Sequence, residues 1–368
     1  MDVFVGSKHL NASITTCLDA TGREHLVVVA KATWRIPEPG QRARPLPPQP
    51  LSFDDRYKGE PGLSAMRYGS DFARFKPRCD VLFDAHAHAP HGEPVRQLDV
   101  GFRVGALSKT IRVHGPRTWK RGPGTWAIDE AAPFLECPLD YAQAFGGARD
   151  YREADGEALS ETYLDNPCGI GWAGDATLGQ VADTAAPRLE ACEEPIRRPD
   201  GAYRPMALGP LGRHWAQRVR HAGTYDAHWQ REVFPFLPED FDERFHQTVP
   251  EDQQMAYPQG GEEVVLLNLR AGRPRTAFHL PLFRPLTTVR ILRKDYRVIT
   301  QEAPVDTLFF ETEQDRFSAV WRTSTPILRR LQEFDCVAIG PVDPAWWQGK
   351  ALGIEGCATC GSAPDKVA

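Results

Sequence analysis

The chain has 368 residues, 41% of them hydrophobic, and its 44 basic and 49 acidic side chains leave a net charge of −5. This balance argues against a nucleic-acid partner held by a basic surface, and no apolar run reaches the length of a membrane-spanning helix. The length is enough to bury a core in one large domain or two ordinary ones.

The N-terminal residues lack the basic start and apolar centre of a signal peptide, so we expect a cytoplasmic protein without a membrane partner. In that compartment its eight cysteines should stay reduced. The 31 glycines and 32 prolines exceed the usual share of these residues, which predicts many turns and irregular connections.

Most predicted elements are strands, identified by alternating hydrophobicity and β-branched residues. Gly105 and Ala106 join two of them as a hairpin, and Gln314 and Asp315 lie near the turn of a second hairpin. The predicted strands span residues 26–36, 79–88, 95–104, 107–114, 263–269, 276–280, 287–300, 306–312 and 317–322.

Three short helices are predicted between these strands. The first spans 139–145 and ends at a glycine pair, and the second spans 227–234 after the capping residue Asp226. The third spans 326–334, where Thr325 would cap a helix with Pro326 in its first turn.

The predicted fold is mainly β: a curved antiparallel sheet or sandwich with a few short peripheral helices. Residues 1–150 form a β-rich part, 151–205 a polar, proline-rich connection, and 206–355 a helix-then-strand part packed on the first. Residues 356–368 form a flexible tail. The proline-rich stretch 36–51 is excluded from a central strand.

One histidine cluster has the composition of a metal site. His86 and His88 share one face of a predicted strand, and His91 follows in a turn. Imidazole suits zinc or iron, but such a site needs further ligands held rigidly. The alternative is a polar strand face with packed or solvated histidines.

Other motifs have ordinary structural readings. The string from Gly169 to Gly174 matches a dinucleotide fingerprint, but a turn-like segment precedes it, which favours a glycine-rich loop. Cys357 and Cys360 form a lone CxxC with no second pair, which favours inert tail thiols. An acidic cluster around 240–252 suits helix caps and pairing with Arg244 as well as it suits catalysis.

Large aromatic residues in polar, turn-rich segments are the more informative signal. Trp, Tyr and Arg dominate the energetics of protein interfaces, although such rings also brace loops onto a sheet. The tryptophans and the tyrosine in question are Trp119, Trp126, Trp172, Trp215, Tyr225, Trp229, Trp346 and Trp347.

A series of short strings, read in order, resembles a known family. They are RYGSD at 67–71, FKPRCDVL at 75–82, AHAP at 87–90, VHG at 113–115, RTW at 117–119, PLDY at 138–141, AFGG at 144–147, NP at 166–167, AGTYD at 222–226, PEDFD at 238–242 and PEDQ at 250–253. Across roughly residues 5–300 the chain resembles the domain of unknown function that accompanies bacterial type VI secretion loci.

The resemblance implies a role and no reaction. Members of that family are taken as accessory adaptors or chaperones that help place a secreted effector on the spike, through its VgrG or PAAR proteins. The resemblance therefore implies no catalytic residue, no cofactor and no enzymatic activity. The resemblance also argues against a metal site at the histidine cluster, because that strand and turn recur in the family as a structural signature.

We expect the anchors for such a partner among one group of aromatic and charged residues, or at a sheet edge that accepts an effector strand. The group comprises Trp215, Arg218, Tyr225, Asp226, Trp229, Phe241 and Arg244. Two alternatives stay open: a metal-dependent hydrolase that uses His86, His88 and His91, and a structural component of the secretion particle.

Overall fold

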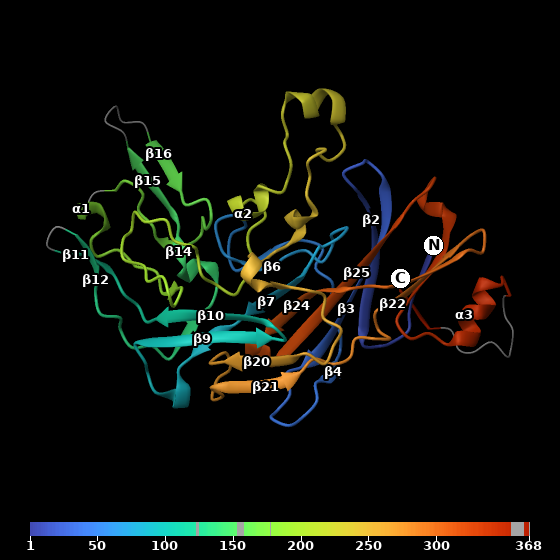
Figure 1. Cartoon of the computed structure of the whole chain (residues 1–368), viewed down its shortest axis with the longest axis horizontal. Helices are drawn as coiled ribbons and strands as arrows, with labels where there is room; N and C mark the ends of the chain where they lie inside the picture. The colour runs from blue at the N-terminus through green and yellow to red at the C-terminus, as the bar shows by residue number, and fades with distance from the viewer. Residues whose placement is uncertain (123–124, 153–157, 177, 355–363, 368) are drawn as a thin grey trace.

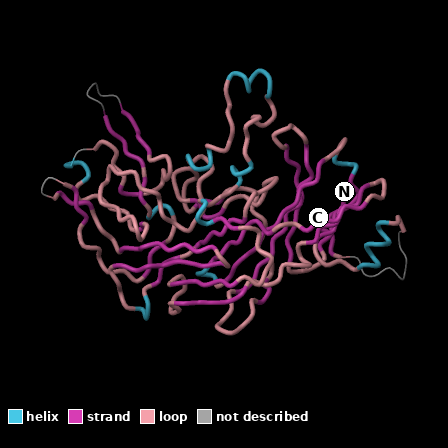
Figure 2. Tube along the Cα trace, in the orientation of Figure 1, coloured by secondary structure: helices cyan, strands magenta, loops and turns pink. Residues whose placement is uncertain are grey.

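The computed structural model describes all residues except 123–124, 153–157, 177, 355–363 and 368. Strands dominate and the helices are short, which confirms the expectation of a mainly β fold (Figures 1 and 2). The sheets are mixed, because β7 pairs with β24 and β1 pairs with β26 in parallel. Within the described residues, no helix is both long and apolar enough to cross a bilayer.

A large mixed sheet forms the centre of the molecule and combines residues from both ends of the chain. Its spine is β3, in which ten successive residues are buried. In spatial order the strands are β19 (Gln254–Met255), β7 (Cys79–Asp84), β24 (Val305–Glu311), β25 (Arg316–Pro326), β3 (Glu24–Arg35) and β2 (Leu10–Leu18), with β4 (Arg44–Leu46) paired to the end of β3.

Two five-stranded sheets flank this centre, and the principal hydrophobic cluster includes residues of all three. The first contains β18 (Leu189–Glu190), β10 (Leu107–His114), β9 (Gln97–Val104), β20 (Glu263–Leu267) and β21 (Arg275–His279). The second contains β23 (Val298–Glu302), β22 (Thr288–Arg293), β26 (Phe334–Ile339), β1 (Asp2–Val5) and β27 (Asp365–Val367).

A smaller lobe lies at one end of the long axis and has a hydrophobic cluster of its own around Trp119 and Phe145 (Figure 1). The segment 151–205, expected to be a connection, supplies much of this lobe. The elements of the lobe are β11 (Trp119–Arg121), β12 (Trp126–Ile128), β14 (Phe145–Gly146), β15 (Ala148–Arg152), β16 (Ala158–Thr162), β17 (Ile170–Gly171) and α1 (Leu178–Val181).

The remaining short elements connect these layers. They are β5 (Arg56–Tyr57), β6 (Met66–Tyr68), β8 (His86–His88), β13 (Glu136–Pro138), α2 (Ala216–Val219) and α3 (Pro344–Ala351). The strand predicted over 79–88 is thus divided, because β7 joins the central sheet whereas β8 pairs with β13.

Both predicted hairpins are present: β9 with β10, and β24 with β25 around Asp315 in the left-handed conformation. The single strand expected over 287–300 is instead a third hairpin, β22 and β23, whose turn contains Tyr296 at φ 63°.

The helix predictions were less accurate. Residues 139–145 contain only a 3-10 turn at Tyr141–Gln143, and residues 227–234 contain a π-helical turn at Trp229–Val233. The helix expected over 326–334 is wrong, because Pro326 ends β25 and only a 3-10 turn follows at Leu331–Glu333. The pattern of a capping residue followed by proline does start a helix later in the chain, where Asp343 caps α3 and Pro344 is its first residue.

Candidate functional site

A projecting segment of residues 221–242, here called the arm, rises above the central sheet (Figure 1, yellow; Figure 2, the uppermost helical turn). It leaves the body after α2 and returns before the 3-10 turn at Glu243–His246. The arm contains Tyr225, Asp226, Trp229 and Phe241, four of the residues predicted to bind a partner.

The neck of the arm is closed by side-chain and backbone hydrogen bonds. Thr224 donates to the Asp240 carboxylate from its backbone N–H at 2.8 Å and from its hydroxyl at 2.7 Å. The backbone N–H of Asp242 donates to the carbonyl oxygen of His221 at 3.0 Å. These bonds hold the two ends of the arm side by side, so the tip is presented as a closed loop.

Trp229 organises the tip. Its ring lies 4.8 Å from the Tyr225 ring and 5.5 Å from the Phe234 ring, both in edge-to-face geometry. Its indole N–H donates to the carbonyl oxygen of Phe236 at 2.9 Å, and its backbone N–H donates to the Asp226 carboxylate at the same distance. Asp226 is therefore a local cap for the π-helical turn.

Three aromatic rings of the arm face solvent. Tyr225 is 53% exposed, Phe234 is 65% exposed and Phe236 is 45% exposed, whereas Trp229 is half-buried beneath them. Edge-to-face packing stabilises the cluster, but much of its apolar surface stays in contact with water. Exposed apolar side chains gathered on one short segment typically mark an interaction site.

Phe234 and Phe236 were absent from the sequence-based selection. The signal was present, because both flank Pro235 in a Phe-Pro-Phe string within the segment already chosen. We name the three exposed rings of Tyr225, Phe234 and Phe236, together with the half-buried Trp229, the aromatic cluster.

Trp215 and Arg218 require correction as contact residues, because both are buried, at 2% and 3% exposed. Trp215 packs edge-to-face against Tyr141 at 5.0 Å. Arg218 donates to the carbonyl oxygens of Phe245 and Leu211, and burial lowers the pKa of its guanidinium to about 10. These two residues fix the base of the arm and present nothing to a partner.

Phe241 and Arg244 lie at the junction between the arm and the body. Phe241 is half-buried, with its ring 5.9 Å from the Phe245 ring. Arg244 is exposed, but its Nε donates to the Asp242 carboxylate at 2.7 Å. This hydrogen bond lowers the pKa of Asp242, and the pair closes the junction locally.

A family model described as "Uncharacterized protein conserved in bacteria (DUF2169)" matches residues 21–322, which is most of the chain. The chain belongs to the DUF2169 family. No curated protein and no solved structure matches it. The match covers the central sheet from β3 to most of β25, as well as the arm.

In this DUF2169 chain His86 and His88 lie near one carboxylate, but His91 does not join them. His88 Nε2 lies 2.8 Å from a Glu313 carboxylate oxygen, and His86 Nδ1 lies 3.8 Å from the same oxygen. His91 is exposed in a separate 3-10 turn at φ 59°. Within the described ranges, no group of three or more histidine, cysteine, aspartate or glutamate side chains has the arrangement to hold a metal ion.

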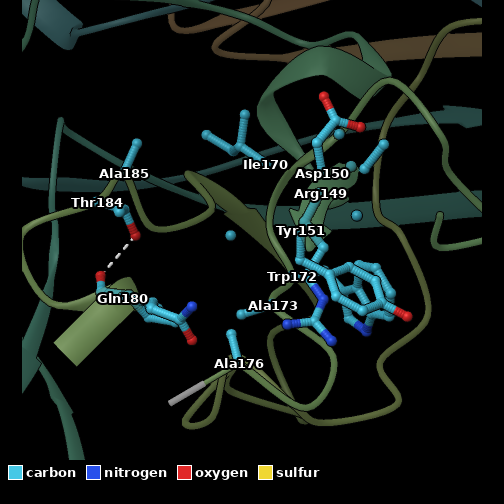
Figure 3. Close-up of a pocket in the computed structure, with 16 residues that line it drawn as sticks. Arg149, Asp150, Tyr151, Ile170, Trp172, Ala173, Ala176, Gln180, Thr184 and Ala185 are labelled. Carbon is cyan, nitrogen blue, oxygen red and sulfur yellow. Dashed lines mark hydrogen bonds between the residues drawn. The ribbon is translucent and has the colours of Figure 1, made fainter. Parts of the chain in front are cut away.

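The glycine string of this DUF2169 chain lies in a loop that includes the two-residue strand β17, as its loop reading predicted. The loop borders a cavity of about 400 Å³ in the smaller lobe (Figure 3). Arg149, Tyr151 and Trp172 lie together on one side of it, and Gln180 and Thr184 lie on the other. Since Arg149 is paired with Glu161 at 2.7 Å, its charge is already balanced.

The acidic cluster has structural roles. Besides Asp240 and Asp242, Glu243 pairs with Arg74, and Asp252 accepts from Lys109 at 3.1 Å. Each of these carboxylates has a basic or capping partner, which confirms the structural reading of the cluster. Cys357 and Cys360 lie outside the described residues.

Proposed function

We propose that this protein is a cytoplasmic adaptor or chaperone that binds a secreted effector and helps load it onto a VgrG or PAAR spike protein of a type VI secretion system. The observation that carries the proposal is the aromatic cluster at the tip of the arm. We choose a secreted effector as the partner because the short sequence strings described above occur in the same order in the family that accompanies type VI secretion loci.

The aromatic cluster suits a polypeptide partner. Burying one exposed Phe or Tyr side chain stabilises a complex by about 1.5–3 kcal/mol, and aromatic residues are the usual centres of binding energy at interfaces. Three such rings on one tip therefore provide enough binding energy to hold a partner, provided that the tip is ordered beforehand.

The arm is ordered by its own contacts. The Trp229 ring, the Asp240 cap and the buried Arg218 fix the tip, the neck and the base respectively. A tip that is already rigid loses less conformational entropy when it binds. The order of the arm therefore supports a role in binding a polypeptide.

The test is co-purification from the native cell of the wild type and of a double variant, Tyr225→Ser with Phe234→Ser. We expect the wild type to retain an effector or a spike protein, identified by mass spectrometry. The double variant should retain at least about 100-fold less, which corresponds to about 2.7 kcal/mol of binding free energy. Both changed side chains are exposed and pack on Trp229 within the arm, so we expect the body of the protein to stay folded, with only a small fall in melting temperature.

A matched control is Phe53→Ser, which removes a ring that is 67% exposed elsewhere on the surface. This variant should retain the partner. Recovery of neither an effector nor a spike protein by the wild type would overturn the proposal. Equal recovery by the wild type and the arm variant would show that the aromatic cluster is not the contact surface.

A further inference from the structure

Strand β2 forms one edge of the central sheet. It pairs with β3 from Leu10 to Leu18, and the order of the sheet ends there. Among the described residues, the first outward-facing amide, that of Leu10, donates to the carbonyl oxygen of Ser7, and no other backbone–backbone hydrogen bond involves the outer side of β2.

The direction of each β2 amide follows from two hydrogen bonds. Across the β2–β3 turn, Asp19 N–H donates to the Arg23 carbonyl, so odd-numbered residues of β2 face β3. On the other side of β3, Ile327 N–H donates to the Glu24 carbonyl, so even-numbered residues of β3 face β25 and odd-numbered residues face β2. This agrees with the first assignment. The amides of Ala12, Ile14, Thr16 and Leu18 therefore point outward.

The sequence of β2 does nothing to block this edge. It reads LNASITTCL, nine residues without a charged side chain and without proline. Natural sheets usually protect an exposed edge with lysine, proline, a bulge or a covering loop, because unpaired strand edges capture other strands. Leu10 and Ala12 are buried, so the accessible part of this edge runs from Ile14 to Leu18, and that part is a template for an added strand.

The arm lies beside this edge. The Phe236 ring is next to the β2–β3 turn, where a methyl group on Gly22 would lie 3.1 Å from it. The turn end of the open edge therefore lies next to Phe236 of the aromatic cluster.

We infer that β2 receives an extended, uncharged segment of a partner protein, which adds to the central sheet as a new edge strand. Backbone hydrogen bonds to the outward groups of residues 14–18 supply the register. Apolar side chains at every second position of that segment face the arm. The inference rests on the proposed function and adds the class of segment recognised and the surface that recognises it.

An extended backbone is the ligand that matches this edge. Outward donors and acceptors alternate along β2 with the spacing of a strand, which neither a helix nor a small molecule reproduces. Because β2 carries no charge, a charged side chain opposite it gains no ion pair from the strand, which favours an uncharged segment.

The experiment selects nonapeptides from a displayed random library on the full-length wild-type protein. Enriched peptides are synthesised, and their affinity is measured by fluorescence anisotropy. The test variant is Thr16→Pro, which removes one outward N–H from an exposed position. The matched control is Thr300→Pro on β23, which is also an edge strand. In β23 the odd-numbered residues face β22, so the amide of the exposed Thr300 also points outward.

We expect enriched peptides that lack charges and are rich in β-branched residues. Thr16→Pro should weaken their binding at least about tenfold, and Thr300→Pro should leave it within about twofold. Hydrogen exchange of the wild-type complex should show new protection at Ile14 and Thr16, and this readout decides the matter if Thr16→Pro fails to fold.

Several results would overturn the inference. These are no enrichment, peptides with charges throughout, equal binding to Thr16→Pro, unprotected β2 amides, or a wild-type dimer in sedimentation in which a second copy already occupies β2. If Tyr225→Ser with Phe234→Ser loses the effector while Thr16→Pro keeps it, the edge is wrong and the adaptor function stands. If the peptides bind but no effector or spike protein is recovered, the edge stands and the adaptor function fails.

Discussion

The guanidinium of Arg218 donates from both Nε and Nη2 to one acceptor, the carbonyl oxygen of Phe245, at 3.0 and 2.9 Å. The two residues lie on either side of the arm in sequence, so this contact joins its ends. The guanidinium also stacks over the Phe245 ring at 5.3 Å and donates to Leu211. A buried arginine whose hydrogen bonds run to carbonyl groups is thus the anchor of the exposed aromatic cluster.

Arg218→Ala should loosen the arm. The change leaves two buried carbonyl groups without donors, so we expect the free energy of unfolding to fall by about 1–3 kcal/mol. Amide hydrogen exchange over residues 221–242 should become faster, as measured by mass spectrometry. Arg231→Ala is the control, since that exposed arginine donates to Ala227 within the arm itself. Unchanged exchange in Arg218→Ala would contradict the anchoring role.

Asp80→Ala should be strongly destabilising. Asp80 is fully buried on β7 and accepts from Lys76 Nζ at 2.8 Å and from Thr248 through its N–H and hydroxyl. Without this carboxylate, the ammonium of Lys76 stays buried without a counter-charge, so we expect a loss of about 3–5 kcal/mol in urea denaturation. Adding Lys76→Met should restore part of the loss. A loss below about 1 kcal/mol would argue against a charged pair.

The stability of the five-stranded sheet that contains β18 should fall in acid through Glu190. Burial raises the pKa of this carboxyl, but hydrogen bonds from His114 and Arg117 outweigh that effect and lower the pKa from 4.5 to about 2. Since the folded pKa is the lower one, the stabilisation is fully present above about pH 4.5 and is lost as the pH falls towards 2.

Glu190→Gln should therefore be less stable than the wild type at pH 7 and should lose stability less steeply between pH 4.5 and 2. The measurement is the free energy of unfolding across this range. Glu130→Gln is the control, because the Glu130 side chain is 77% exposed. Parallel pH curves for Glu190→Gln and the wild type would contradict the assignment.

Added zinc should leave the melting temperature unchanged. His88 is engaged with Glu313, and His91 lies on a separate exposed turn, so the three histidines do not form one ligand set. Isothermal titration calorimetry with zinc chloride, together with the metal content of the purified protein, provides the measurement. A stoichiometric, tightly bound ion that is lost in His86→Ala would instead support the hydrolase alternative.

The strands were predictable where the local pattern and the final environment agree. The β24–β25 hairpin follows from two alternating runs around Gln314 and Asp315, and Asp315 takes the left-handed turn conformation that the hairpin requires. The sequence from Thr325 to Pro326 has the local signature of a helix start, yet both residues pair with β3. Pairing along the full length of β3 outweighs the local capping preference.

The candidate site was also predicted only in part from the sequence. Composition and aromatic content drew attention to 215–244, and Tyr225 and Trp229 do lie in the exposed cluster. The same reasoning chose Trp215 and Arg218, which are buried, and passed over Phe234 and Phe236, which are exposed. An aromatic or arginine side chain has the same chemistry in a core as on a surface, so residue type alone does not distinguish the two.

The amino-acid sequence by itself determined a mainly β protein, its principal hairpins and the segment in which large aromatic residues gather, because these depend on patterns within a few residues. Only the tertiary structure decided which rings face water, which strand forms the edge of the central sheet, and that the arm lies beside that edge. These properties depend on contacts between residues far apart in the chain, such as Gly22 with Phe236, and no local pattern encodes them.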